Sequence, residues 1–193
     1  MILLDPDLDP DAVSRSAAGK PSVGAKTPNL RMPSKPTLAR FLAQATQAVR
    51  LRGQVSVLLT TNATQRGLNR RFRGKNKTTD VLSFPTDFDA PRSGDAPGSE
   101  KIAGDLSISV PIAIIQAWQQ GHSLATEIKV LILHGLLHLA GYDHETDSGQ
   151  MARRERTLRT RLRLPGGLIE RTALPKPVSK SKASVPAKKR RRA

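Results

Sequence analysis

Apolar and polar residues follow one another along the chain with two different periods, and polar segments rich in proline and glycine separate these stretches. Apolar residues recur every three or four positions where a helix buries one face, whereas strands show short β-branched runs or strict alternation. The first pattern predicts five helices, at about residues 36–51, 62–71, 112–120, 124–140 and 148–164. The second predicts four strands, at about residues 2–4, 55–60, 80–84 and 104–110. We therefore expect an α+β fold, with a mixed sheet of about four strands and about five helices.

Composition divides the chain into three parts. Residues 1–36 begin with the short strand and continue as an insertion rich in Pro, Asp, Ser, Gly and Lys, which we expect to be irregular or disordered. Residues 37–165 carry the periodic patterns and enough apolar residues for one core. Residues 166–193 form a basic tail that we expect to be disordered. The sequence thus predicts one folded domain between two polar ends.

The charge of the chain indicates a polyanionic partner. Its 32 Lys and Arg and 16 acidic residues give a formal net charge of +16, of which residues 171–193 supply +9 without any acid. Such a charge favours binding to phosphates through counterion release, and the usual polyanion inside a cell is nucleic acid. The basic run at residues 188–192 either contacts RNA or is a solvated end that improves solubility.

The absence of cysteine excludes a disulfide framework and is compatible with a reducing cytosol. The first residues lack the positive start and the long apolar run of a signal peptide. No apolar run reaches the ~20 residues that a membrane span needs. We therefore expect a soluble, cytoplasmic protein that does not act at a membrane.

Residues 127–140 are apolar on nearly every face, which predicts a helix that is buried in the centre of the domain and packed against the sheet. Because residues four apart share one helix face, His134 and His138 can bind the same ion. A bend at Gly141 can bring His144 back as a third ligand. A lone buried histidine is more often hydrogen-bonded within the core, but three histidines with an open fourth position are typical of a catalytic zinc site. The pattern predicts one zinc ion, although residue types alone do not distinguish zinc from other first-row divalent metals.

A second informative segment joins the helix at residues 62–71 to the strand at residues 80–84. Five basic residues crowd eight positions of this segment: Arg70, Arg71, Arg73, Lys75 and Lys77. This density of charge suits phosphate binding, and an exposed basic loop is the alternative. Pro85 ends the strand, because proline cannot donate a hydrogen bond to a sheet.

Taken together, these segments resemble the YbeY family of bacterial metal-dependent endoribonucleases. The resemblance covers roughly residues 37–164, and the segments that carry it are His134-Gly-Leu-Leu-His138-Leu-Ala-Gly-Tyr-Asp-His144, Arg73-Gly-Lys, Thr79-Asp80-Val-Leu-Ser-Phe-Pro85 and the Gly104-Asp105 strand. Metzincin proteases share the histidine spacing, whereas the segment from Arg73 to Pro85 is typical of the YbeY family. The insertion at residues 12–35 and the basic tail fall outside the family core, and Asn76 stands where the family often has Asp.

The resemblance implies a single-strand-specific RNase that acts in ribosomal RNA maturation, notably at the 3′ end of the 16S ribosomal RNA, and in ribosome quality control. Its partners would be single-stranded RNA, ribosomal RNA and the ribosome, with no small-molecule organic cofactor. The resemblance also implies zinc on His134, His138 and His144, and a catalytic Arg73 in the active cleft. Residues 37–165 would then be the catalytic domain.

The site residues suggest a mechanism. Zinc held by three imidazoles lowers the pKa of bound water toward ~7 and polarises a phosphate oxygen. The planar guanidinium of Arg73 matches phosphate and would neutralise charge that develops in the transition state. The sequence leaves open whether the nucleophile is a metal-bound hydroxide or the 2′-hydroxyl of the RNA.

Five other residues near these segments have less definite roles. Asp143 either hydrogen-bonds to a ligand histidine and orients it, or serves as a turn residue or helix cap. Asp80 and Asp105 either hold the backbone of the site, bind a partner, or make local turn contacts. We expect Tyr142 in the core, and we assign no ligand role to His122, which lies at the turn before the histidine helix.

Two other functions fit parts of the pattern. Zinc proteases of the His-Glu-x-x-His type use the glutamate after the first histidine as a general base, but this position is Gly135 here. A non-catalytic ribosome-binding factor with structural zinc fits the charge. Three ligands without a fourth from Cys or His nevertheless favour an open, working site.

Overall fold

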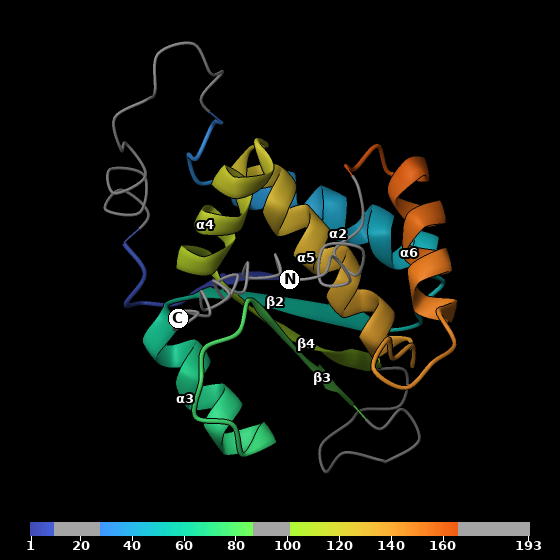
Figure 1. The fold of residues 1–193 in the computed structure, drawn as a ribbon, viewed down its shortest axis with the longest axis horizontal. Helices are drawn as coiled ribbons and strands as arrows, with labels where there is room; N and C mark the ends of the chain where they lie inside the picture. The colour runs from blue at the N-terminus through green and yellow to red at the C-terminus, as the bar shows by residue number, and fades with distance from the viewer. Residues whose placement is uncertain (10–27, 87–100, 166–193) are drawn as a thin grey trace, which may run out of the picture.

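The computed structural model describes residues 1–9, 28–86 and 101–165 (Figure 1). Its strands are β1 (Ile2–Leu4), β2 (Gln54–Thr60), β3 (Val81–Pro85) and β4 (Ile102–Ser109). Its helices are α2 (Lys35–Val49), α3 (Asn62–Arg73), α4 (Val110–Gln120), α5 (Leu124–Leu139) and α6 (Gln150–Arg161). The predicted α+β class is therefore confirmed. Most of the predicted insertion and the whole predicted tail lie outside the described residues.

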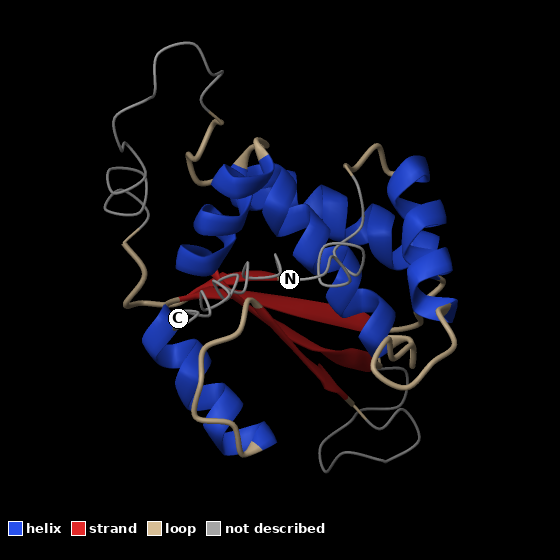
Figure 2. Ribbon diagram, viewed as in Figure 1, coloured by secondary structure: helices blue, strands red, loops and turns tan. Residues whose placement is uncertain are grey.

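The four strands form one mixed sheet in the order β1-β2-β4-β3. Strands β1, β2 and β4 are parallel, and β3 runs antiparallel to β4 at one edge. Figures 1 and 2 show α2, α4, α5 and α6 on one side of the sheet and α3 on the other. Because β1 pairs with β2, residues 2–4 belong to the same core as the rest of the domain.

Helix α5 lies at the centre of the molecule and packs against the sheet, as its apolar sequence predicts. Its fully buried side chains include Leu124, Ile128, Leu131, Ile132, Leu133, Leu136 and Leu137. The Ser123 hydroxyl caps the helix by accepting a hydrogen bond from the Thr126 amide at 3.1 Å. Gly135 allows the helix to approach β4 closely, since a Cβ atom there would lie 2.7 Å from a methyl carbon of Leu106.

The last helix begins differently from the prediction. Asp147 and Gln150 have the spacing of a capping box, in which Asp147 would be the N-cap, but the N-cap of α6 is Gly149, which has a φ of 80°. The Asp147 carboxylate still accepts hydrogen bonds from the backbone amides of Gly149 and Met151, both at 2.7 Å. The Asp147 side chain, in the turn before α6, therefore accepts hydrogen bonds from backbone amides in the first turn of this helix, which have no partner within the helix.

Residues 28–34 form neither helix nor strand, yet they are attached to the domain. Leu30 is buried in the core, and the Asn29 carbonyl accepts a hydrogen bond from the Leu124 amide at 2.9 Å. The contact holds this segment against the start of α5. None of the helices in the described ranges is long and apolar enough to cross a membrane.

Candidate metal centre

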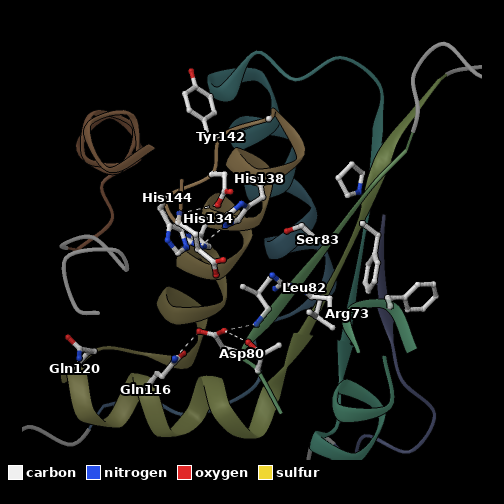
Figure 3. Close-up of a pocket in the computed structure, with 18 of the residues that line it drawn as sticks. Arg73, Asp80, Leu82, Ser83, Gln116, Gln120, His134, His138, Tyr142 and His144 are labelled. Atoms are coloured by element: carbon white, nitrogen blue, oxygen red, sulfur yellow. Dashed lines mark hydrogen bonds between the residues drawn. The ribbon is translucent and has the colours of Figure 1, made fainter. Parts of the chain in front are cut away.

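The three predicted histidines meet at the C-terminal end of α5. The Nε2 atoms of His134 and His138 are 3.2 Å apart, and the ligand atoms of all three histidines lie within 4.8 Å of one another. Figure 3 shows the three rings together on one wall of a pocket. His134 is buried, whereas His138 and His144 are half-buried and reach the solvent side. The structure thus brings the predicted ligands to one point.

A tight bend after α5 returns His144 to the other two histidines. The helix ends at Leu139, and Gly141 follows with a φ of 86°, a left-handed conformation that glycine adopts without steric cost. The Tyr142 amide then donates a hydrogen bond to the Leu137 carbonyl at 3.0 Å. This backbone contact turns the chain back over the last turn of the helix, as the glycine position predicts.

The geometry and the protonation of the histidines fit a metal ion. Two nitrogens that bind one tetrahedral zinc at ~2.0–2.1 Å are about 3.3 Å apart, close to the His134–His138 separation. Burial, together with the charges of His134 and His144, lowers the pKa of His138 to about 4, although the Asp143 carboxylate and the backbone of Tyr142 oppose the shift. His138 is therefore neutral at neutral pH, which is the form that binds a metal.

Glu155 of α6 contributes to the site and is missing from the sequence prediction. Its Oε2 atom lies 3.4 Å from Nδ1 of His134, on the ring edge opposite Nε2. Its Oε1 atom accepts a hydrogen bond from Nε of Arg159 at 2.7 Å. A carboxylate behind a ligand histidine fixes the tautomer and the orientation of the ring. The signal in the sequence is an acid on the apolar face of α6, between Met151 and Leu158.

Asp143, the carboxylate that the sequence offers for this task, makes turn contacts. It accepts hydrogen bonds from the Glu145 amide at 3.1 Å and the Thr146 hydroxyl at 2.8 Å. These two bonds lower its pKa below the usual value, and His138 and His144 contribute less. The hydrogen bonds of the Asp143 side chain therefore fit the turn role, one of the two alternatives that the sequence leaves open.

Of the other four residues with less definite roles, Asp80, Tyr142 and His122 make structural contacts. Asp80 accepts hydrogen bonds from the Val81 amide at 2.9 Å and the Gln116 side chain at 3.0 Å, which ties β3 to α4. Asp105 is exposed on β4. Tyr142 is half-buried and packs against the core, and His122 contacts the buried Glu127 rather than the three histidines.

Arg73 lines the same cleft as the three histidines. The cleft has a volume of about 1050 Å³, and its wall consists of β3, the end of α3, part of α4 and the bend after α5. Arg73 is the last residue of α3, because Gly74 takes a left-handed conformation with a φ of 67° and ends the helix. In Figure 3, Leu82 and Ser83 of β3 lie between Arg73 and the histidines. The catalytic role of Arg73 stays a prediction.

Comparison with known proteins places the chain in a family. The family model described as Endoribonuclease YbeY matches residues 27–163. The protein named Endoribonuclease YbeY from Koribacter versatilis is 51% identical over 142 residues, which cover 74% of this chain and 86% of that protein. The proteins of the same name from Solibacter usitatus and Moorella thermoacetica are 45% and 47% identical, and cover 71% and 58% of this chain and 85% and 75% of their own lengths. The chain therefore belongs to the YbeY endoribonuclease family.

Proposed function

We propose that this protein is a zinc-dependent endoribonuclease that cleaves single-stranded RNA in ribosomal RNA processing, including maturation of the 16S 3′ end. The observation that carries the proposal is the meeting of His134, His138 and His144 in one cleft that Arg73 also lines. We assign the activity to residues 37–165, together with β1, which completes their sheet. The ribosome is the proposed site of action in the cytoplasm, where the same residues would serve ribosome quality control.

Each site residue has a defined task in this proposal. His134, His138 and His144 hold the ion, and Glu155 orients the His134 ring from behind. The bound ion supplies Lewis acidity at a phosphate. Arg73 binds the phosphate through its planar fork and neutralises negative charge as the transition state forms. Residues 62–79 contain six Lys or Arg and no acid. Their positive electrostatic field would attract the negatively charged RNA backbone to this end of the cleft.

The packing of Gly135 argues against the protease alternative. A general-base glutamate would have to follow the first histidine, where the chain has Gly135. A Cβ atom at this position would lie 2.7 Å and 3.1 Å from the two methyl carbons of Leu106, and Leu106 is buried in the core. Any side chain at residue 135 would therefore disturb the packing of α5 on the sheet.

Activity assays on purified protein test the proposal. Unstructured RNA should be cut, whereas duplex RNA and casein should not, and a chelator should stop the cleavage until zinc is returned. His138→Ala should lose both bound metal and cleavage, and Arg73→Ala should lose cleavage while it keeps the metal. The matched controls are His122→Ala, outside the trio, and Arg40→Ala, which is exposed on α2. Full cleavage by His138→Ala would remove the metal from the reaction.

The cellular role has a separate test. Cells that lack the protein should accumulate 16S ribosomal RNA precursors with extended 3′ ends, because the proposed cut is not made. The wild-type chain should restore the mature end, and His138→Ala should not. Normal 3′ ends in the deletion strain would assign the nuclease to another RNA.

A further inference from the structure

Phe72 is an exposed aromatic side chain in the metal cleft. It is 57% exposed, and among the exposed large apolar residues of the described chain it is the one that lines this cleft. Its neighbour in sequence, Arg73, lines the same cleft. A single exposed apolar residue needs no explanation by itself. Phe72 differs from a single exposed residue in two respects: the arginine that we propose binds phosphate follows it in the sequence, and the three histidines line the same cleft.

The ring of Phe72 is held in a fixed position. It packs against the Phe84 ring of β3, with 5.1 Å between the centroids and 69° between the planes. The guanidinium carbon of Arg71 lies 5.3 Å from the Phe72 centroid. Phe72 therefore has an aromatic ring packed against it and a cation over its face, and it still exposes more than half of its surface.

The backbone around Phe72 is also held in place. Gly74 ends α3 with its amide bonded to the Arg70 carbonyl at 3.2 Å. The Asn69 side chain donates to the Lys77 carbonyl at 2.7 Å and fastens the following loop to the helix. The ring is thus carried by a fixed helix end, so little conformational entropy is lost when a ligand stacks on it.

We propose that Phe72 is a stacking platform for one unpaired base of an RNA strand whose backbone lies along Arg73. This inference rests on the proposed nuclease function and deepens it. Aromatic side chains beside basic ones are the usual surface for single-stranded nucleic acid, because every base has a face that can stack. A base inside a duplex already stacks on its neighbours. Phe72 therefore favours unpaired RNA without selecting a particular base.

Binding measurements on three variants test this role. Phe72→Leu keeps an apolar side chain but no ring, Phe72→Tyr keeps the ring, and Ile115→Leu is a control on α4, where Ile115 is 55% exposed outside the cleft. The probe is a labelled, unstructured RNA of twelve nucleotides, together with a set of the same RNAs that each carry one abasic position. Affinities are measured by fluorescence anisotropy with excess chelator so that the RNA stays intact. Thermal melting of each variant shows that it is folded.

The stacking role predicts a specific pattern of affinities. Phe72→Leu should weaken binding of the intact RNA by about 5- to 150-fold, the usual range for one stacked base. Phe72→Tyr and Ile115→Leu should bind like the wild type. For one of the abasic RNAs, the wild type should bind more weakly than it binds the intact RNA. With that abasic RNA, the wild type and Phe72→Leu should have the same affinity.

Two results would overturn the inference while leaving the nuclease in place. In the first, the wild type binds and cleaves RNA and Phe72→Leu binds equally well. In the second, Phe72→Leu loses affinity by the same factor for every abasic RNA, which would mean that the ring only supports the fold. A wild type that neither binds nor cleaves RNA would overturn the proposed function itself.

Discussion

His134 is held from both edges of its ring. Nε2 faces His138, and Nδ1 faces the carboxylate of Glu155, which in turn pairs with Arg159. Glu155 and Arg159 are 1% and 2% exposed, so neither charge is screened by much water. A buried carboxylate without partners would be costly, and the contacts to Arg159 and His134 compensate for its lost hydration. We therefore expect metal binding by the three histidines to depend on Glu155 of α6, which is not itself a proposed ligand.

Glu155→Gln should weaken metal binding by about 10- to 100-fold, because the neutral amide orients His134 less strongly and makes its nitrogen less basic. Competition between the folded protein and a chromogenic chelator measures this affinity. Glu145→Gln is the control, since Glu145 is an exposed carboxylate that lines the same cleft. Equal affinities in the two variants would show that the ring is oriented without Glu155.

Strand β3 carries one wall of the cleft and is held at the edge of the sheet by its pairing with β4. Gly104 makes this pairing close: a Cβ atom there would lie 2.5 Å from the Phe84 carbonyl oxygen and 2.8 Å from a Leu139 methyl carbon. Its φ of 149° is also one that other residues rarely adopt. The position of β3, and with it of Phe84 and Ser83, thus depends on the absence of a side chain at residue 104.

Gly104→Ala should lower the free energy of unfolding by about 2–4 kcal/mol, from the combined strain and steric overlap with backbone. Urea denaturation measures the change. Gly67→Ala is a matched control, because nothing lies within 4 Å of a Cβ atom in this α3 position. It should raise stability by about 0.4–1 kcal/mol. A Gly104→Ala protein as stable as the wild type would contradict the close pairing.

Besides its pairing with β2, strand β1 is held to the sheet by a buried carboxylate that follows it, Asp5, which contacts Thr60 of β2. Burial by itself raises the pKa of Asp5, but hydrogen bonds from the Thr60 hydroxyl and the Asp7 amide, with smaller contributions from Thr64 and Thr61, bring it below 3.8. Since the folded pKa is below the unfolded one, the ionised group stabilises the fold above pH 3.8. That contribution is lost as the pH falls through the folded pKa.

Asp5→Asn should therefore be less stable than the wild type at neutral pH, and the difference should shrink as the pH falls below 3.8. Thermal or urea unfolding across this pH range measures it. Asp7→Asn keeps the backbone amide that bonds to Asp5 and changes only an exposed side chain, so its difference from the wild type should stay small throughout. A constant deficit for Asp5→Asn at every pH would contradict the assignment.

At the scale of the whole molecule, the positive charge extends well beyond the cleft. The formal charge of +16 includes +9 from residues 171–193, and residues 1–170 supply the remaining +7. Binding of RNA to the cleft and to such a tail would both release counterions. The two contributions would differ, because only binding in the cleft would position the RNA at the proposed metal site.

Removal of residues 166–193 should make RNA binding less sensitive to salt, because each lost phosphate contact on a single strand reduces the slope of log K against log salt by about 0.7. Cleavage at saturating RNA should be retained. Anisotropy titrations at several salt concentrations measure the slope. As a control of equal length, a chain whose nine tail Lys and Arg are replaced by Ser should behave like the truncated one. An unchanged slope in both would show that the tail makes no RNA contact.

The sequence alone determined the features that arise from local periodicity and spacing. Apolar residues at helical spacing and short β-branched runs predicted the five helices and four strands of the described chain. The i, i+4 spacing of His134 and His138 and the glycine at residue 141 predicted the ligand trio, because helix geometry and a left-handed turn are local properties. The segment from Arg73 to Pro85 indicated the family in the same way.

Only the tertiary structure decided which distant residues meet. Glu155 is 21 positions from His134, and the packing of α6 against α5 brings it behind that ring. Phe72 and Phe84 belong to α3 and β3, and the placement of these elements puts them side by side in the metal cleft. Such contacts depend on how helices and strands pack across the core, and no short-range pattern encodes the partner of a side chain on another element.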